Sequence, residues 1–331
     1  MMRFLVIGCG SIGEKHIRNL KSSLAREVIA CDVKEERLRL IKKRYNIETY
    51  DDIEKALAQQ VSAALICTPT STHLPVTLAA AKRGLHLFIE KPLSHTLDGI
   101  DQLIQIVREK KLVALVGCNT RFFASMKFVK KLVDNGSIGR VLLARASCGF
   151  YLPYWHPGED YRKGYTANKS LGGGIILDDI HEIDYLRWLL GEVGEVFSVS
   201  GKISNLEMDT EDFASILLKF EGGTIAEVHL DCLQHTYRRS CELIGEKGII
   251  VWDYIKESVR LFTEKEKRWQ VFSKDLRTGK NAMFIAEMKH FIDCIEGKDT
   301  PISDLIQAKR VLEIALTAKK SAQTGKIIKI Y

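Results

Sequence analysis

The sequence lacks any apolar run that approaches the roughly 20 residues needed to span a bilayer. Its first apolar segment is short and passes directly into a glycine-rich turn, so we expect no signal peptide. Internal repeats and low-complexity segments are also absent from the sequence. These absences point to a globular protein of the cytoplasm that does not contact a membrane.

Paired cysteine motifs are absent as well. The eight cysteines include no C-x-x-C pair, and no Cys/His cluster has zinc spacing, so we expect no metal. Several cysteines lie inside apolar runs, as in Leu65-Ile66-Cys67, which is typical of buried free thiols in a reducing compartment. The net charge is +7, but the basic residues are dispersed and often lie beside acids, so we expect no nucleic-acid partner.

The chain is long enough for two domains, with 331 residues of which 46% are hydrophobic and 27% charged. Strand and helix patterns alternate over the first 120 residues, which is typical of a parallel sheet covered by helices on both faces. We expect strands at residues 3–7, 28–31, 63–67, 85–89 and 113–117, and helices at 12–22, 35–45, 52–59, 74–83 and 97–110. The alternation stops near Arg121, so we place the two domains at residues 1–120 and 121–331.

A glycine motif directly follows the first expected strand. Gly8, Gly10 and Gly13 form G-x-G-x-x-G between a strand and a helix, the context in which this motif binds a dinucleotide. The first glycine permits a tight turn, the second lets a pyrophosphate approach the backbone, and the third lets helix and strand pack closely. The helix then presents N–H groups to the phosphates at its start, near Ser11 and Ile12. The alternative is an ordinary glycine-rich turn without a ligand.

Asp32 supports the dinucleotide interpretation. It follows the second strand, 19 residues after Gly13, close to the separation of about 20 expected for a carboxylate that binds the adenine ribose. A carboxylate at this position repels a 2′-phosphate, so the sequence predicts NAD rather than NADP as the cofactor.

Ligands of such sheets bind beyond the carboxyl ends of the strands, so the residues after each strand are candidates. In addition to the glycine motif and Asp32, we expect the cofactor to contact Thr68, Pro69, His73, Glu90, Lys91 and Asn119. Lys91 precedes a proline, which holds it extended at the end of its strand. The alternatives are that Ser71 or Thr72 only caps a helix beginning near Pro75, and that Lys91 is an ordinary surface lysine.

The second half of the chain contains consecutive strands, which predict a largely antiparallel sheet. We expect strands at residues 141–150, 196–203, 213–220, 224–230, 240–244, 248–252, 258–262 and 327–330, and helices at 126–133, 177–190, 284–295 and 305–322. The predicted fold class is therefore α/β, with a doubly wound parallel sheet followed by an α+β domain that has an open, largely antiparallel mixed sheet.

The helix expected at residues 177–190 carries polar groups on one face. Asp178, His181 and Tyr185 fall within about 60° of one another at 100° per residue. A carboxylate three residues from an imidazole can orient the ring or raise its pKa, as in many general acid/base pairs. The alternative is a histidine on the helix surface in a local ion pair.

A polar aromatic loop precedes this helix. Trp155 and Tyr161 offer stacking faces for a sugar, and Arg162 offers a planar fork for a carboxylate or phosphate. The alternative is that these aromatic side chains only pack the loop.

Together these stretches resemble the glucose–fructose oxidoreductase, inositol dehydrogenase and MocA family over nearly the whole chain. The resemblance rests on the glycine motif, on Glu90-Lys91-Pro92, on residues 116–122, and on the glycines at 172–174 that lead to Asp178, His181 and Asp184. It implies a Rossmann fold followed by an open mixed sheet whose outer face often forms an oligomer interface. It also implies that Lys91 and His181 are catalytic. The aspartate of the family often stands four residues before the histidine, where this chain has Leu177, and Asp178 stands three before.

We therefore predict an NAD-dependent oxidoreductase that transfers a hydride between nicotinamide and a hydroxyl or keto group of a sugar, a sugar derivative or a cyclitol. The expected catalytic residues are Lys91, His181 and Asp178, and the expected substrate-binding residues add Arg121, Trp155, Tyr161 and Arg162. We expect a homo-oligomer, dimer or tetramer. The alternatives are a non-enzymatic NAD-binding regulator on the same fold and an NAD-dependent glycosidase.

Overall fold

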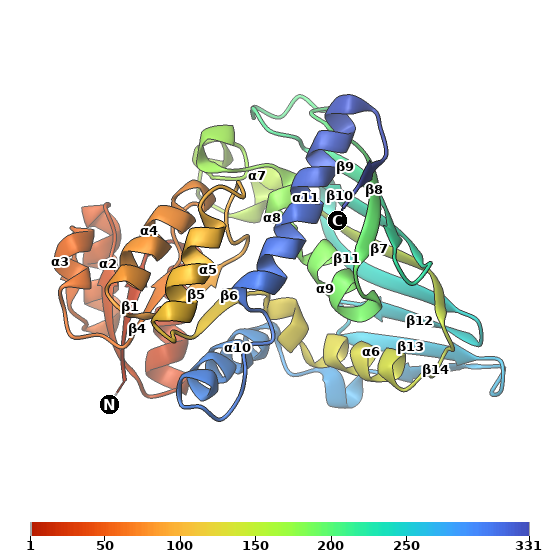
Figure 1. Cartoon of the computed structure of the whole chain (residues 1–331), viewed down its shortest axis with the longest axis horizontal. Helices are drawn as coiled ribbons and strands as arrows, with labels where there is room; N and C mark the ends of the chain where they lie inside the picture. Colours follow the sequence, from red (N-terminus) through yellow and green to blue (C-terminus); the bar gives the residue numbers. More distant parts are fainter. Residues whose placement is uncertain (1, 331) are drawn as a thin grey trace. The chain divides into compact units, whose positions relative to one another are not determined.

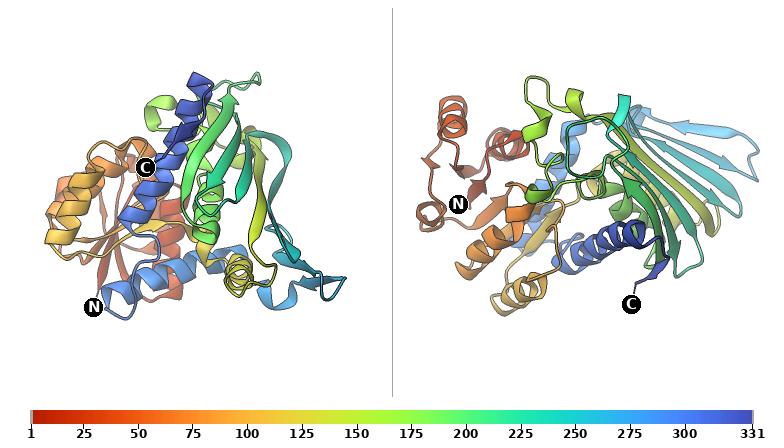
Figure 2. Two further views of the ribbon diagram at one scale, coloured as in Figure 1. Left: turned by 45° about the vertical axis from the view of Figure 1, so that its right-hand side comes forward. Right: turned by 90° about the horizontal axis from the view of Figure 1, so that it is seen from above.

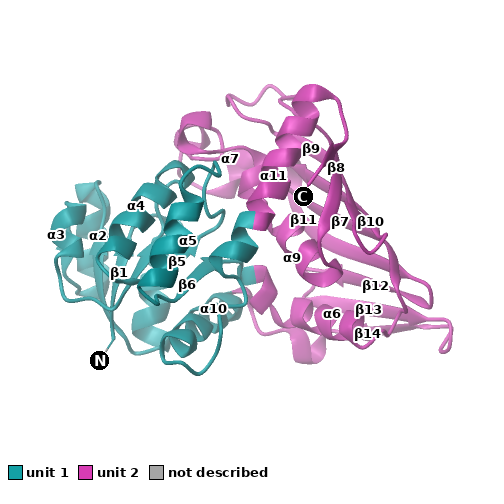
Figure 3. Cartoon of the chain, in the orientation of Figure 1, with its two compact units in different colours: residues 1–119, 281–309 teal, residues 120–280, 310–331 magenta. Residues whose placement is uncertain are grey.

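The computed structural model describes residues 2–330, which fold into two compact units (Figure 3). Residues 2–119 and 281–309 form the first unit, and residues 120–280 and 310–330 form the second. The sequence places the second domain at 121–331 as one stretch, with a C-terminal segment able to pack back on the first. In the structure the returning segment is residues 281–309, and the chain after it rejoins the second unit.

The first unit is built on a parallel sheet, of which Figure 1 labels β1, β4, β5 and β6. Among the described residues its strand order is β3-β2-β1-β4-β5-β6. Its elements are β1 (Arg3–Ile7), α1 (Ser11–Arg18), β2 (Glu27–Cys31), α2 (Glu35–Tyr45), β3 (Thr49–Tyr50), α3 (Ile53–Leu57), β4 (Ala63–Ile66), α4 (Thr70–Lys82), β5 (His86–Glu90), α5 (Ile100–Glu109) and β6 (Ala114–Gly117). The order reverses between β1 and β4, the point where open sheets of this class bind ligands beyond their carboxyl ends. A π-helical turn, Asn19–Ser23, extends α1.

One apolar core fixes the sheet against three helices. Phe4, Val6 and Phe88 point from the strands into this core, where they meet side chains of α1, α2 and the late helix α10 (Lys280–Ile295). Phe88 is fully buried and packs edge-on against Phe291 of α10, with ring centroids 5.7 Å apart. Burial of one such ring contributes roughly 1.5–3 kcal/mol, so α10 is an integral part of the first unit although it lies late in the sequence.

Helix α4 begins earlier than the sequence predicts. Its first residue is Thr70, and Pro75 lies inside it, so the predicted capping by Ser71 or Thr72 is wrong. Both residues are helical, and the Thr72 hydroxyl donates to the Pro69 carbonyl at 2.8 Å. Pro75 is the sixth residue of α4, so it removes the N–H that would donate to the Ser71 carbonyl, and the helix continues with that hydrogen bond missing.

The second unit contains a mixed sheet, with strand order β14-β13-β12-β11-β7-β10-β9-β8-β15 within residues 2–330. Figure 2 shows these strands fanned side by side in its right-hand view. The strands are β7 (Val141–Tyr151), β8 (Val193–Gly201), β9 (Phe213–Phe220), β10 (Ile225–Asp231), β11 (Leu233–Gly245), β12 (Gly248–Asp253), β13 (Ser258–Thr263), β14 (Trp269–Phe272) and β15 (Ile328–Lys329). The β7–β10 pair is parallel and the other pairs are antiparallel, so the sheet is mixed and largely antiparallel, as predicted. Strand β14 was not predicted.

The two faces of this sheet differ. The inner face packs against α6 (Ala124–Asp134), α8 (Ile175–Asp178) and α9 (His181–Leu190). Side chains along β9 alternate between buried and exposed, so the opposite face carries exposed apolar groups such as Leu217, which is 43% exposed. The last long helix is α11 (Leu305–Thr324). Across the described chain, no helix combines the length and apolar character that crossing a membrane requires.

Candidate active site

The loop between β1 and α1 requires two of its three glycines for its own packing. Gly8 has φ of +93°, and a Cβ there would lie 2.5 Å from the Cys67 carbonyl oxygen. A Cβ on Gly13 would lie 1.9 Å from the Gly8 carbonyl oxygen. Gly10 is different, because a Cβ there would meet no atom of the described chain within 4 Å. The protein therefore leaves open space at Gly10, where a pyrophosphate would approach the backbone.

The start of α1 also fits a phosphate group. Gly10 precedes the helix and offers no side chain to cap it, so the N–H groups of the first turn, near Ser11 and Ile12, are available to a ligand. The same residues were predicted to bind the cofactor.

Asp32 lies directly after β2 and supports the glycine loop. Its carboxylate accepts hydrogen bonds from the backbone N–H of Cys9 at 2.6 Å and of Lys34 at 2.8 Å. A carboxylate can accept about four hydrogen bonds, so these two leave capacity for ribose hydroxyls. The glycine loop and Asp32 together fit an NAD molecule.

His73 is buried rather than directed at a ligand. Its Nδ1 lies 2.8 Å from the Pro92 carbonyl oxygen, and its Nε2 lies 2.8 Å from the Thr68 carbonyl oxygen. Both partners are acceptors, so both bonds form only when the ring carries two protons. Burial nevertheless lowers the pKa of His73, although the two carbonyl groups oppose this effect. His73 therefore ties the segment after β4, which includes the exposed Pro69, to the segment after Lys91.

Lys91 directly follows β5, is half-buried, and is joined to Pro92 by a cis peptide bond. The preceding residue, Glu90, is buried and lies with its Oε1 2.7 Å from Nε2 of His16 on α1. Glu90 was predicted to bind the cofactor, but its carboxylate is directed into the first unit. The contact between Glu90 and His16 was not predicted.

Asn119 and Arg121 lie in a short 3-10 helix, Asn119–Phe122, that follows β6, and both are buried. The guanidinium of Arg121 forms two hydrogen bonds with the carboxylate of Asp184 in α9, at 2.9 and 2.6 Å. Arg121 is only 1% exposed, so its predicted role in substrate binding loses support, and its contact with Asp184 makes it a structural residue.

The helix predicted at residues 177–190 is interrupted. Helix α8 ends at Asp178, Asp179 has non-helical torsions of φ −98° and ψ 41°, and α9 begins at His181. The prediction of one continuous helix is therefore wrong, and its periodicity no longer places Asp178 and His181 on a common face. His181 is nearly buried at the first position of α9.

Asp178 is held by two hydroxyl groups from the preceding loop. The Tyr165 hydroxyl donates to its Oδ1, and the Thr166 hydroxyl donates to its Oδ2 at 2.7 Å. These contacts connect Asp178 to the segment that follows Trp155 and Tyr161. Tyr165 and Thr166 were not predicted, because nothing local in the sequence distinguishes them from other loop hydroxyls.

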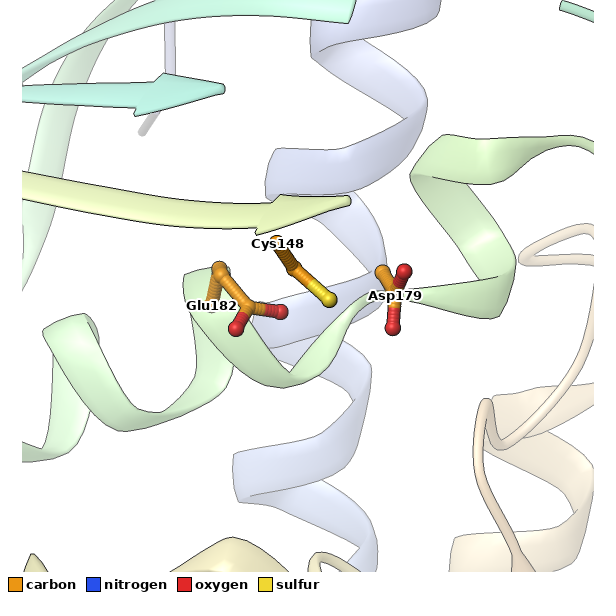
Figure 4. Close-up of side chains that lie close together, drawn as sticks. All are labelled: Cys148, Asp179 and Glu182. Carbon is orange, nitrogen blue, oxygen red and sulfur yellow. The ribbon is translucent and has the colours of Figure 1, made fainter. Parts of the chain in front are cut away.

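Cys148, Asp179 and Glu182 form a buried cluster, and their side chains point toward one another in Figure 4. Their ligand atoms are close enough to hold a metal ion. However, the guanidinium of Arg239 lies 2.5 Å from Asp179 and 2.9 Å from Glu182, and already supplies a positive charge. Burial raises the pKa of Glu182 to about 7, assisted by the charge of Asp179 and opposed by that of Arg239. The cluster is therefore an ion-pair network, which no local pattern in the sequence predicts.

The loop side chains predicted to bind substrate are largely engaged. Trp155 is partly exposed and packs on Phe150, with ring centroids 4.5 Å apart. The Tyr161 hydroxyl accepts a hydrogen bond from the Glu207 N–H at 3.1 Å. Arg162 pairs with Asp160 at 2.8 Å and with Glu207 at 3.2 Å, which raises its pKa and neutralises much of its charge.

Comparisons with known proteins decide the family. Residues 2–118 match an oxidoreductase family with an NAD-binding Rossmann fold, and residues 126–251 match the GFO/IDH/MocA C-terminal domain. This chain belongs to the GFO/IDH/MocA family. It is 30% identical to the myo-inositol 2-dehydrogenase of Thermotoga maritima, over 99% of this chain and 98% of that protein. It is 28% identical to the scyllo-inositol 2-dehydrogenase (NAD(+)) of Bacillus subtilis, over 98% of this chain and 95% of that protein.

The fold of this GFO/IDH/MocA member also matches solved structures. Levoglucosan dehydrogenase in complex with NADH and levoglucosan aligns with a TM-score of 0.90 and 20% identity, over 99% of each chain. The predicted family, the predicted fold class and NAD as cofactor are confirmed. The chain is an NAD-dependent dehydrogenase that acts on CH–OH groups.

Proposed function

We propose that this enzyme oxidises a hydroxyl group of a cyclitol, with myo-inositol as the first candidate and sugars as the wider class. The observation that carries this proposal is the full-length similarity to two inositol 2-dehydrogenases. The structure is compatible with it, because the Rossmann unit is complete and the second unit supplies a histidine at the start of a helix.

In this proposal His181 takes the proton of the substrate hydroxyl, and the Lys91 ammonium stabilises the oxygen as it becomes negative. NAD, when bound, supplies the hydride acceptor. Gly10 and the start of α1 hold its pyrophosphate, and Asp32 holds its adenine ribose. Asp178 orients the loop through Tyr165 and Thr166.

The experiment is a screen in which the enzyme and NAD are incubated with myo-inositol, scyllo-inositol, free sugars, uronates and nucleotide sugars. The formation of NADH is monitored by its absorbance, and the products are analysed. Oxidation of a cyclitol with stoichiometric NADH is the expected result. Sugar release without net NADH would indicate an NAD-dependent glycosidase. NAD binding with no turnover of any candidate would favour a non-enzymatic regulator.

We also propose a homo-oligomer in the cytoplasm. The outer face of the second unit's sheet carries neighbouring exposed apolar side chains at Leu143, Val199, Leu217 and Ile225, which suits contact with a second copy. The cysteines among the described residues are all free thiols, which suits a reducing compartment. Light scattering tests the oligomer, since Leu217→Glu should yield a smaller species, whereas Lys265→Glu in the exposed turn after β13 should not.

A further inference from the structure

His16 and Glu90 form a buried pair that joins the cofactor helix to the end of strand β5. His16 is fully buried on α1, about one turn after the residues that face the pyrophosphate. Its Nε2 lies 2.7 Å from Oε1 of Glu90. Edge-on contacts with Phe88 at 5.1 Å and Phe284 at 6.3 Å hold the ring in this orientation.

The carboxylate of Glu90 has little freedom to move. Its Oε2 lies 3.3 Å from the backbone nitrogen of Lys91. On another side it packs against the backbone of Gly117, where even a Cβ would come within 3.3 Å of the same oxygen. Glu90 is therefore confined between His16, Gly117 and the start of the Lys91 segment.

His16 has a single polar partner among the described residues. Its Nδ1 is buried and makes no hydrogen bond there, so Glu90 is the group to which the imidazole is directed. A buried histidine with one orphaned nitrogen is costly, which argues that its contact with Glu90 serves more than packing.

We propose that His16 is a positioning residue for the reaction, which keeps Glu90 ionised against Lys91 and thereby holds Lys91 in place and in its ammonium form. This inference rests on the role proposed above for Lys91. An ionised Glu90 attracts the neighbouring ammonium, and that charge is needed to stabilise the oxygen of the substrate.

The surroundings of Glu90 support this electrostatic role. Burial alone raises the pKa of Glu90, but the hydrogen bond and charge of His16 and the charges of Lys91 and His73 outweigh it, and the pKa lies below its usual value. The titratable groups that face Glu90 come from α1, the end of β4, α4 and β5, namely Lys15, His16, Cys67, His73 and Lys91. Without His16, the hydrogen bond and the charge that most oppose burial are lost, so the pKa of Glu90 should rise.

The test compares His16→Leu, Glu90→Gln and the double variant, with Lys91→Ala beside them. His16→Leu should lower kcat roughly tenfold near pH 6, and the loss should shrink as pH rises and Glu90 ionises. Glu90→Gln should show a similar loss at every pH, and the double variant should lose no more than Glu90→Gln alone. NADH affinity, from calorimetric titration, should change less than about threefold throughout.

Two further variants separate this role from simple stability. His16→Gln can still donate to Glu90 and should keep most of kcat. His86→Leu, at the opposite end of β5, removes a histidine that accepts from the Val113 N–H and should leave the pH profile unchanged. If His16→Leu does not fold, the activity of the isosteric Glu90→Gln variant alone tests whether an ionised Glu90 is needed.

Full activity in Glu90→Gln would overturn the proposal, as would a loss in His16→Leu that does not depend on pH. If Lys91→Ala is itself fully active, the role proposed for Lys91 fails first. If Lys91→Ala is inactive but His16→Leu and Glu90→Gln are normal, only the present inference fails.

Discussion

The guanidinium of Arg121 and the carboxylate of Asp184 form a doubly hydrogen-bonded ion pair in which both side chains are almost fully buried. Asp184→Asn should destabilise the protein by about 3–5 kcal/mol, because it leaves a buried positive charge without its counter-charge. Replacing both partners by Met and Leu should cost less than the sum of the single changes. Urea denaturation measures these values. As a control, Asp134→Asn breaks an exposed i,i+4 pair with Lys130 and should cost at most about 0.5 kcal/mol.

The glycine loop provides a matched pair of substitutions. Gly10→Ala should leave the fold and its stability nearly unchanged, because φ is −66° and the added methyl group meets no protein atom, yet it should weaken NADH binding by roughly tenfold or more. Gly13→Ala should destabilise the protein itself, because its methyl group would overlap the Gly8 carbonyl. Thermal unfolding and calorimetric titration distinguish the two effects. Unchanged NADH affinity in Gly10→Ala would place the pyrophosphate elsewhere.

Asp32 should set the preference for NAD over NADP. We expect NADH to bind more tightly than NADPH, because the carboxylate repels the 2′-phosphate. Asp32→Ser should reduce that preference by about tenfold, mainly through weaker NADH binding, since it removes ribose contacts and the acceptor for the Cys9 N–H. Titration of the unaltered enzyme and of Asp32→Ser with NADH and with NADPH measures the ratio of the two affinities in each protein. Tighter NADPH binding by the unaltered enzyme would remove this role from Asp32.

The sequence predicts elements better than it predicts contacts between them. Helix 35–45 is predicted with the ends that the structure shows, because its boundaries depend on local pattern alone. The pairs Arg121–Asp184 and His16–Glu90 join residues 63 and 74 positions apart. No local pattern specifies such partners, and only the folded sheet brings them together. For that reason Arg121 was predicted to bind substrate, whereas its charge is buried against Asp184.

The interrupted helix shows the same limit at the site. The residues of 177–190 are compatible with one helix, and the periodicity places Asp178 and His181 on one face. The structure breaks the helix at Asp179, whose carboxylate binds Arg239 on β11. A contact with a distant strand therefore overrides the local helical pattern.

Glu182 should make the stability of the protein depend on pH. Its pKa is raised to about 7 in the folded state, so between about pH 4.5 and 7 the folded state binds more protons than the unfolded state. Stability contributed by this group should therefore fall as pH rises through that window, by on the order of 1–3 kcal/mol. Glu182→Gln should remove this dependence, whereas Glu264→Gln on an exposed turn should keep it. Thermal unfolding of the three proteins between about pH 4.5 and 7 measures this dependence. A stability that rises with pH in that window would contradict the raised pKa of Glu182.

The proposed role of His181 as the base is tested most directly by the pH dependence of kcat/KM for myo-inositol oxidation, measured for the unaltered enzyme and for His181→Ala. An imidazole must be neutral to act as a base, so kcat/KM of the unaltered enzyme should rise with pH through one ionisation and then level off. In His181→Ala, kcat/KM should no longer rise with pH. It should also be lower by a factor of roughly 10²–10⁴, the usual contribution of a positioned proton-transfer group. An unchanged pH profile in His181→Ala would contradict this role and assign the proton transfer to another group.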